Sequence, residues 1–427
     1  MAQSLLYGKR VTDRLRSQMT PEEVAKRLRP RLPEDVPLPP RLPAGNDASQ
    51  HGIDVRRAVL RDGYGYNPDL LDQPLPSSEQ LQGNIENLIG FIQLPLGAIG
   101  PLRVNGLHAH GDYIVPMATT EGALIASYHR GAYVLSQSGG AEVICMSETV
   151  ARAPGFVFAN LTQAAFFMDW IVNHAETFRD AVAETTRHGE LLDIKLSSCG
   201  CLVYLIFEYE TGDAAGQNMV TIATDNVCRK IVEMSPVKPL RWYVEANLSG
   251  DKKASMQSFL SVRGKKVVAS AQLPNRLIQK FLHTTAFEMA EQCRVASLGA
   301  MQSGTIGAQA HYANALAAMF MACGQDVACV AEAAVGITTM TVTDDGLQVS
   351  VTMPNLVVGT VGGGTHLPSA RACLQMLDCA GAGKARAFAE ICAATALAGE
   401  ISIVAAMSAG HFTRAHTYHR HKLEKPS

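Results

Sequence analysis

An aspartate and two lysines stand together in the stretch Gly250-Asp251-Lys252-Lys253. The ammonium group of lysine is strongly hydrated, so a lysine pair either stays in solvent on a turn or is held in place to meet an anion. Taken alone, such a run is typical of a solvated turn, and only the rest of the chain can decide between the two. If the two lysines are held in place, this stretch can bind an anion.

A carboxylic acid, Glu121, stands beside two threonines at the entrance of an apolar helical pattern that extends through Arg130. An acid is favoured there simply because the N-terminal end of a helix carries partial positive charge. If the carboxyl is buried instead, its pKa is raised and it can serve as a general acid. Both interpretations remain open at this point.

Residues 153–247, which precede the lysine pair, alternate between strand and helix patterns. The predicted elements are strand 156–158, helix 164–184, strands 191–197 and 202–209, helix 218–234 and strand 240–244. This order, βαββαβ, is the split βαβ or ferredoxin-like arrangement. It predicts a self-contained module.

The second helix of that module follows the glycine-rich run Gly212 to Met219. Glycines at a helix entrance let a ligand approach the backbone, and the free N–H groups there favour phosphate oxygens. The spacing differs from the dinucleotide fingerprint of doubly wound folds. Thr186-Arg187 could meet a further phosphate, although Arg187 could equally be a surface arginine.

After Lys253 the chain predicts a strand at 266–273, an alanine-rich helix at 311–323 and a long helix at 385–409. The alanine-rich helix is thin enough for close packing and ends at Gly324-Gln325-Asp326. Asp326 is therefore expected near whatever this helix packs against, or it is a loop residue after a glycine stop.

The composition limits the possible classes of protein. The chain has 427 residues, 47% of them hydrophobic, which is enough for two or three domains. Its net charge of −2 argues against a nucleic-acid partner. Because only 18% of the residues are charged and 36 are glycine, a homo-oligomer is favoured over a monomer.

Ten cysteines without a Cys-x-x-Cys pair indicate reduced thiols in a cytoplasmic protein. No secretory signal opens the sequence, and Glu400 interrupts the longest apolar stretch, so we expect no membrane association. The histidines near the end have no acid or thiol cluster beside them. We therefore predict a basic tail and no metal site.

Seven runs together resemble the catalytic portion of class I 3-hydroxy-3-methylglutaryl-CoA reductases, over roughly residues 51 to 420. The runs are Glu86-Asn87-Leu88-Ile89-Gly90, Pro116 to Gly122, Gly212 to Met219, Asp251-Lys252-Lys253, Gly324-Gln325-Asp326, Gly359 to Thr365, and Gly410-His411 through His416. The sequence separation of Lys252 and Asp326 is also similar to class I. The resemblance implies a four-electron reduction of a thioester to an alcohol.

By this resemblance, the catalytic residues are Glu121, Lys252, Asp326 and His416. Lys252 would stabilise the developing oxyanion, Glu121 would protonate that oxygen, and His416 would protonate the departing CoA thiolate. Asp326, close to both Lys252 and Glu121, would keep the lysine charged and raise the pKa of the glutamate.

The resemblance also implies NADPH as the cofactor and an acyl-CoA as the substrate. The residues expected to bind NADPH are Thr186, Arg187, Gly212, Asp213, Ala214, Gly216, Asn218 and Met219. The residues expected to bind the acyl-CoA are Arg130, Arg152, Asp251, Lys253, Arg294 and Asn314. Arg187 would meet the 2′-phosphate and Arg130 the CoA.

The expected fold is α+β, with a large, mostly helical substrate domain and an inserted ferredoxin-like cofactor domain. The expected divisions are an N-terminal helical arm at 1–85, an acyl-CoA-binding domain at 86–152 and 254–427, an NADP-binding domain at 153–244, and a connecting loop with the catalytic lysine at 245–253. The family further implies a homodimer or homotetramer with active sites between subunits, and Glu86 to Gly90 in the dimer contact.

Several pocket positions depart from the family pattern. Cys329-Val330 and Ala333-Ala334 replace a Gln-Asn and a serine pair, and Ala415, His129, Arg294 and Glu245 replace a serine, an asparagine, a lysine and a serine. The four catalytic residue types are intact. Two alternatives therefore stay open: a relative that reduces a different acyl-CoA, and a non-catalytic CoA-binding paralogue.

Overall fold

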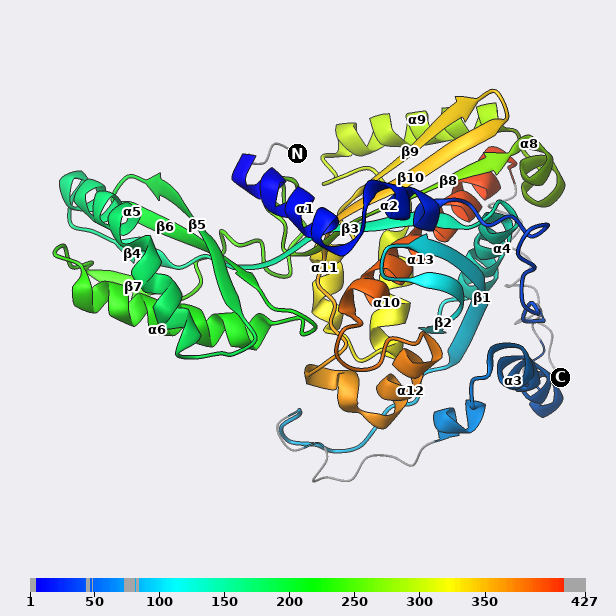
Figure 1. The fold of residues 1–427 in the computed structure, drawn as a ribbon, viewed down its shortest axis with the longest axis horizontal. Helices are drawn as coiled ribbons and strands as arrows, with labels where there is room; N and C mark the ends of the chain where they lie inside the picture. The colour runs from blue at the N-terminus through cyan, green and yellow to red at the C-terminus, as the bar shows by residue number, and fades with distance from the viewer. Residues whose placement is uncertain (1–4, 44–46, 48, 73–80, 82–83, 411–427) are drawn as a thin grey trace.

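The computed structural model describes residues 5–43, 47, 49–72, 81 and 84–410 (Figure 1). Helices and strands both contribute substantially, so the predicted α+β class is confirmed. Figure 1 shows two lobes. The smaller one, drawn in green, is built from residues 155–243, and the larger one contains most of the remaining elements.

The smaller lobe has the predicted βαββαβ order of elements. They are β4 (Gly155–Val157), α5 (Leu161–Ala183), β5 (Glu190–Cys199), β6 (Leu202–Glu210), α6 (Gln217–Met234) and β7 (Arg241–Tyr243). The strands pair antiparallel in the order β7-β4-β6-β5. Phe156 on the sheet, Phe167 on α5 and Val227 on α6 are fully buried in one core, so both helices pack on the sheet.

The larger lobe contains a sheet that the sequence did not predict, apart from its strand at 264–274. Its strands are β1 (Leu96–Gly106), β2 (His110–Ala118), β3 (Ala141–Arg152), β8 (Gly264–Pro274), β9 (Ile337–Thr343) and β10 (Gly346–Leu356). They pair in the order β2-β1-β3-β8-β10-β9. The expectation of a mostly helical region did not include this sheet, because Gly97, Gly100 and Pro101 lie within β1 and are typical of turns.

Strand β3 belongs to both lobes. Its residues 142–149 pair with β8, whereas its last three residues, 150–152, pair with β6. The strand therefore carries Arg152, at its end, to the boundary between the two sheets.

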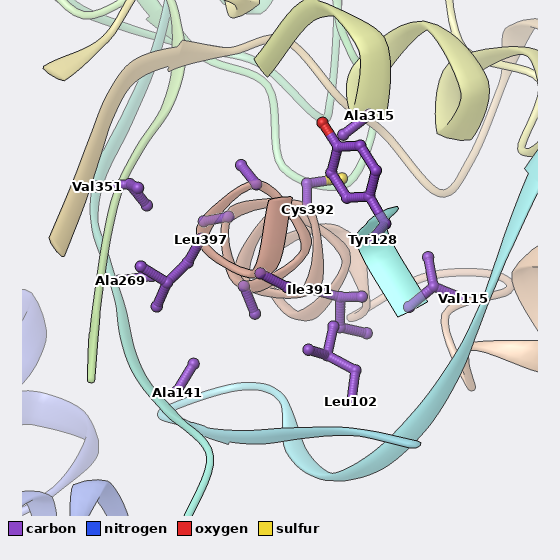
Figure 2. Packing of buried hydrophobic residues seen from close by; sticks show 14 of the residues in the cluster. Leu102, Val115, Tyr128, Ala141, Ala269, Ala315, Val351, Ile391, Cys392 and Leu397 are labelled. Atoms are coloured by element: carbon purple, nitrogen blue, oxygen red, sulfur yellow. The ribbon is translucent and has the colours of Figure 1, made fainter. Parts of the chain in front are cut away.

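Helix α13 (Ala385–Ser408) is the centre of the larger lobe. Figure 2 shows it end-on beside the curved sheet, with Leu102, Val115 and Tyr128 directed toward it. Helix α4 (Leu124–Gln137), which carries Tyr128, packs against it. The helix is long and apolar enough to cross a membrane by composition, but 78% of the relevant window is buried inside the fold. Its small residues serve close packing in a protein core.

Two glutamates on α13 are buried where they accept backbone hydrogen bonds. Glu390 accepts from the N–H groups of His108, Ala109 and Cys145. Burial raises the pKa of Glu390 to about 7, against the opposing effect of these hydrogen bonds. Glu400 accepts from the N–H of His311, which fixes the start of helix α10 (Tyr312–Ala322).

The remaining helices lie around this core. Those of at least eight residues are α1 (Leu5–Gln18), α2 (Pro21–Leu28), α3 (Gln50–Tyr64), α9 (Ala286–Ser303) and α12 (Pro368–Met376). A capping box begins α2: Thr20 accepts from the N–H of Glu23, and Glu23 accepts from the N–H of Thr20. The arm that follows is fixed to β1, because Arg31 donates to Asn105 over 2.6 Å.

Candidate active site

The lysine of the 250–253 turn is held in place. Lys252 Nζ lies 2.7 Å from Oδ2 of Asp326, and each side chain remains 40% exposed. Asp326 follows the glycine stop of α10, and its other oxygen accepts from the N–H of Ala328 over 3.1 Å. The hydrogen bond to Asp326 raises the pKa of Lys252, although burial acts in the opposite direction. The Lys252 ammonium is therefore paired with a carboxylate, although its side chain stays partly in solvent.

Glu121 lies between β2 and α4, and it meets a residue of α10. Asn314, in the first turn of α10, donates from Nδ2 to Glu121 Oε2 over 2.8 Å. The Glu121 side chain is exposed in the single chain, so the buried carboxyl considered from the sequence is not present here. The structure nevertheless joins two residues that the family pattern assigns to the site.

The two pairs lie toward opposite ends of α10. Asn314 is near its start, and Asp326 follows its end at Ala322. At 1.5 Å per residue, the eight steps from 314 to 322 cover about 12 Å. Within the described residues, no hydrogen bond or ion pair joins Glu121 or Asn314 to Lys252 or Asp326. The expectation that Asp326 is close to Glu121 is thus not met within one chain.

A buried network of charges lies beneath the lysine turn. Arg152 Nη1 is 2.7 Å from Oδ2 of Asp251, and Arg263 Nη2 is 2.6 Å from Oδ1. The second pair is an ion pair without hydrogen-bond geometry. Arg263 also pairs with Glu332, which accepts from the backbone N–H of Lys252 over 3.1 Å. Burial acts to raise the pKa of Asp251, but Arg263 and Arg152 outweigh it and hold the pKa below its ordinary value.

Sequence reasoning missed Arg263 and Glu332. Both side chains are almost completely buried, and neither stands in a motif that indicates this. The available signal is weak: Glu332 is a single acid between alanines in Ala331-Glu332-Ala333, where the chain is otherwise apolar.

The predicted cofactor turn leads into α6 as expected. Gly216 caps the helix with φ 79°, and a Cβ there would lie 2.4 Å from Cγ2 of Thr211, so glycine is required. Thr186 donates to the sulfur of Met219 over 3.0 Å, which places these two candidates side by side. Arg187 is exposed and makes no hydrogen bond or ion pair with the residues that the structure describes.

Asp213 has a different contact from the one expected. Its carboxylate accepts from the N–H of Gly383 over 2.7 Å and of Ala385 over 3.0 Å. It thereby ties the glycine-rich turn to the first residues of α13. The neighbouring Ala214 forms a bridge with Val361, whereas Asn218 is exposed.

Three further candidates bond to other residues of the chain, and one candidate cannot be placed. Arg130 donates to the carbonyl oxygen of Ser402 on α13 over 2.8 Å. Arg294 pairs with Glu291 of its own helix. Lys253 Nζ donates to the carbonyl oxygen of Asp251 over 2.9 Å. His416 lies outside the described residues.

Comparison with known proteins decides the family. The model of the hydroxymethylglutaryl-coenzyme A reductase family matches residues 52–421. The chain belongs to this family. It is 40% identical over 374 residues to the 3-hydroxy-3-methylglutaryl-coenzyme A reductase of Methanocaldococcus jannaschii, covering 86% of this chain and 92% of that one. The enzyme of Pyrococcus horikoshii is 43% identical over 381 residues, covering 87% and 92%.

A solved structure has the same fold. The class II 3-hydroxy-3-methylglutaryl-CoA reductase of Streptococcus pneumoniae, described as bound to NADPH in open conformations, has a TM-score of 0.68. The match covers 84% of this chain and 97% of that one at 17% identity. This similarity supports the reductase fold.

Two departures from the reductase pattern lie against the charge network. Glu245 Oε2 is 3.6 Å from Arg152 Nη1, so this arginine faces two carboxylates. Cys329, three residues after Asp326, is buried and accepts from Gln217 Nε2 over 2.8 Å. Burial raises the pKa of Cys329 to about 12, so this thiol stays protonated near neutral pH.

Proposed function

We propose that this protein reduces 3-hydroxy-3-methylglutaryl-CoA to mevalonate and free CoA in two hydride transfers, as its family membership indicates. The observation that carries the proposal is the Lys252–Asp326 pair. A fixed ammonium beside a carboxylate stays protonated and can meet negative charge on the thioester oxygen and, later, on the aldehyde oxygen. The Asp326 carboxylate also holds the Lys252 side chain in one position, where it would otherwise be mobile in solvent.

The first reduction breaks the thioester. After hydride addition, the tetrahedral oxyanion takes a proton from Glu121. The resulting hemithioacetal returns this proton to Glu121 as it collapses to an aldehyde and expels the CoA thiolate, which takes a proton from His416. After the second hydride addition, the alkoxide takes a proton from Glu121. Lys252 stabilises the oxyanion at both stages. Asn314, which holds the Glu121 carboxyl, would orient this proton donor.

The smaller lobe is proposed as the ferredoxin-like NADPH-binding domain, residues 153–244. Its turn fits a nucleotide phosphate, because no side chain caps the first N–H groups of α6 and the exposed guanidinium of Arg187 makes no hydrogen bond or ion pair with the described residues. Thr186, Arg187, Asn218 and Met219 would hold the cofactor. When bound, NADPH supplies the hydride.

The direct test is to follow NADPH absorbance and free CoA thiol with hydroxymethylglutaryl-CoA as substrate. Two NADPH should be consumed for each thiol released.

A second candidate function, reduction of a different acyl-CoA, is favoured by Glu245, which shares Arg152 with Asp251 and lowers the positive charge available to an acyl carboxylate. Faster reduction of an acyl-CoA without that carboxylate would establish it. Binding of CoA without reduction of any acyl-CoA would indicate the non-catalytic paralogue.

Arg187→Ala is expected to change the cofactor preference. Loss of one charge-assisted contact to the 2′-phosphate should weaken the binding of NADPH by about 1.5–3 kcal/mol, which is roughly 10- to 100-fold in affinity. The binding of NADH should stay nearly unchanged. Initial rates over a range of both cofactors measure this. Arg179→Ala, in the same lobe but paired with Glu176, is the matched control. Equal losses for both cofactors would show that Arg187 is structural.

The active site is proposed to form between subunits of a homodimer or homotetramer. An apolar run supports this: Ile89, Phe91 and Ile92 are exposed in the single chain, and Ile89 is completely so. They lie in or beside Glu86 to Gly90, the predicted contact. An interfacial site also accounts for the two separate pairs, because Lys252–Asp326 of one subunit can face Glu121–Asn314 of another.

Mixed oligomers test this arrangement. A heterodimer of Lys252→Ala and Glu121→Gln subunits, isolated through two affinity tags, contains one intact site if the pairs meet across the interface. Its activity should reach about half that of the wild-type dimer, although each parent homodimer is nearly inactive. No recovery in the heterodimer would place both residues in one chain. A monomeric mass in light scattering at micromolar concentration would exclude the interface altogether.

We also propose that the enzyme is of class I and acts in the cytoplasm. All ten cysteines are free thiols in the structure, as expected in a reducing compartment. The separation of Lys252 and Asp326 in the sequence is similar to class I.

A further inference from the structure

The side chain and the backbone of Lys252 both contact one short segment of the chain, residues 326–332. Its ammonium group meets Asp326 over 2.7 Å, and its backbone N–H donates to Oε1 of Glu332 over 3.1 Å. Asp326 and Glu332 are joined only by the short helices η4 (Val327–Cys329) and α11 (Val330–Ala333). The backbone position of the lysine and the anchor of its ammonium are therefore set by the same piece of structure.

The backbone of Lys252 needs such a contact. Its φ is 57°, in the left-handed region that a side chain with a Cβ rarely adopts. A residue in this region persists only where its surroundings hold it, and such residues are common at functional sites. The backbone N–H of Lys252 has such a contact, because it donates a hydrogen bond to the buried side chain of Glu332.

Arg263 holds the acceptor in place. It pairs with Glu332 on one side and with Asp251, the residue before Lys252, on the other. The Arg263 side chain is 1% exposed and the Glu332 side chain 0%, so neither can exchange its partner for water. A buried carboxylate without a cation would not remain ionised, and without its charge it would be a weaker acceptor.

We propose that Glu332 and Arg263 are positioning residues for Lys252: Glu332 fixes the backbone of the lysine, and Arg263 fixes Glu332 together with Asp251. This inference rests on the proposed function. It assigns part of the transition-state stabilisation to two buried residues that touch neither substrate nor cofactor. Their effect reaches the reaction only through the place at which the Lys252 ammonium is held.

The test compares Glu332→Gln with Glu332→Leu. Glutamine keeps an oxygen that can accept from Lys252, whereas leucine removes it. A misplacement of about 1 Å can cost about 10²-fold in rate. We therefore expect kcat to fall about 10²-fold in Glu332→Leu and less than about tenfold in Glu332→Gln. The KM for NADPH should stay unchanged in both. Thioester and aldehyde reduction should decline by the same factor, because Lys252 acts in both.

Removing one member of a buried ion pair can prevent folding, so a second variant is needed. Arg263→Met combined with Glu332→Leu removes both charges, and apolar replacement of a whole buried pair is commonly tolerated. We expect this double variant to recover thermal stability relative to Glu332→Leu without recovering kcat. Recovery of both quantities together would overturn the positioning role.

Glu390→Gln is the matched control, because this carboxylate is equally buried and also accepts backbone hydrogen bonds, but on α13. It should change stability and leave kcat unchanged. If the wild type reduces neither the thioester nor the aldehyde, the proposed function itself fails. If the wild type is active and both the leucine variant and the double variant keep its kcat, the function stands and only the positioning role is wrong.

Discussion

Lys252→Ala should abolish reduction of both hydroxymethylglutaryl-CoA and the aldehyde intermediate. The substitution removes the ammonium that we propose meets the oxyanion at both stages, and loss of one such donor costs about 10²–10³-fold in kcat. Stability should change little, because Lys252 and Asp326 are each 40% exposed and a partly exposed ion pair contributes about 0–1 kcal/mol. Steady-state rates with each substrate, at matched thermal stability, measure the effect.

Lys253→Ala is the natural comparison, since this residue is adjacent but its ammonium bonds to the carbonyl oxygen of Asp251. It should raise the KM for the acyl-CoA more than it lowers kcat. If Lys252→Ala reduces the aldehyde at the wild-type rate, Lys252 has no role in the second stage. Equal kcat losses in the two variants would mean that the turn as a whole, and not one ammonium, is required.

His416→Ala should separate the two stages of the reaction. Thioester reduction expels a thiolate that needs a proton, and aldehyde reduction does not, so only the first should slow, by about 10²–10⁴-fold. The role of His416 rests on the family pattern, because the residue lies outside those described. His419→Ala, a neighbouring histidine with no assigned role, should match the wild type with both substrates.

Glu121→Gln should give a different profile from His416→Ala, and the difference between the two variants makes the comparison decisive. Each stage leaves an oxygen that must be protonated, so thioester and aldehyde reduction should both decline. If His416→Ala slows aldehyde reduction as much as thioester reduction, the histidine is shared between stages or structural. The assignment of separate proton donors would then be wrong.

The smaller lobe could be predicted because its signals are local. Each apolar run there is bounded by turn residues and has the length of one strand or helix, as in β6 and α6. The larger sheet could not be predicted in the same way. Strand β1 contains two glycines and a proline within its first six residues, and its pairing with β3 depends on residues far along the chain. Tertiary packing overrides local preference there.

The candidate site shows the same limit. Lys252 and Asp326 could be named from a family motif, and the structure joins them. Glu332 could not, because a lone acid between alanines is more typical of a helix surface than of a buried network. Arg130 was assigned to CoA from its motif, but its bond to Ser402 depends on how α4 packs against α13, which no local pattern specifies.

The central position of α13 has a consequence for biosynthesis. Residues 153–244 are continuous in sequence and can close their own core soon after they leave the ribosome, because domains generally fold as units during synthesis. The strands β1, β2 and β3 are made earlier still, but the helix that they enclose is the last described element of the chain (Figure 2). Their apolar faces must stay uncovered until residues 385–408 have been translated. Nascent chains of this reductase should therefore depend on chaperones late in synthesis, and premature termination before Ala385 should leave a folded smaller lobe attached to an aggregation-prone remainder.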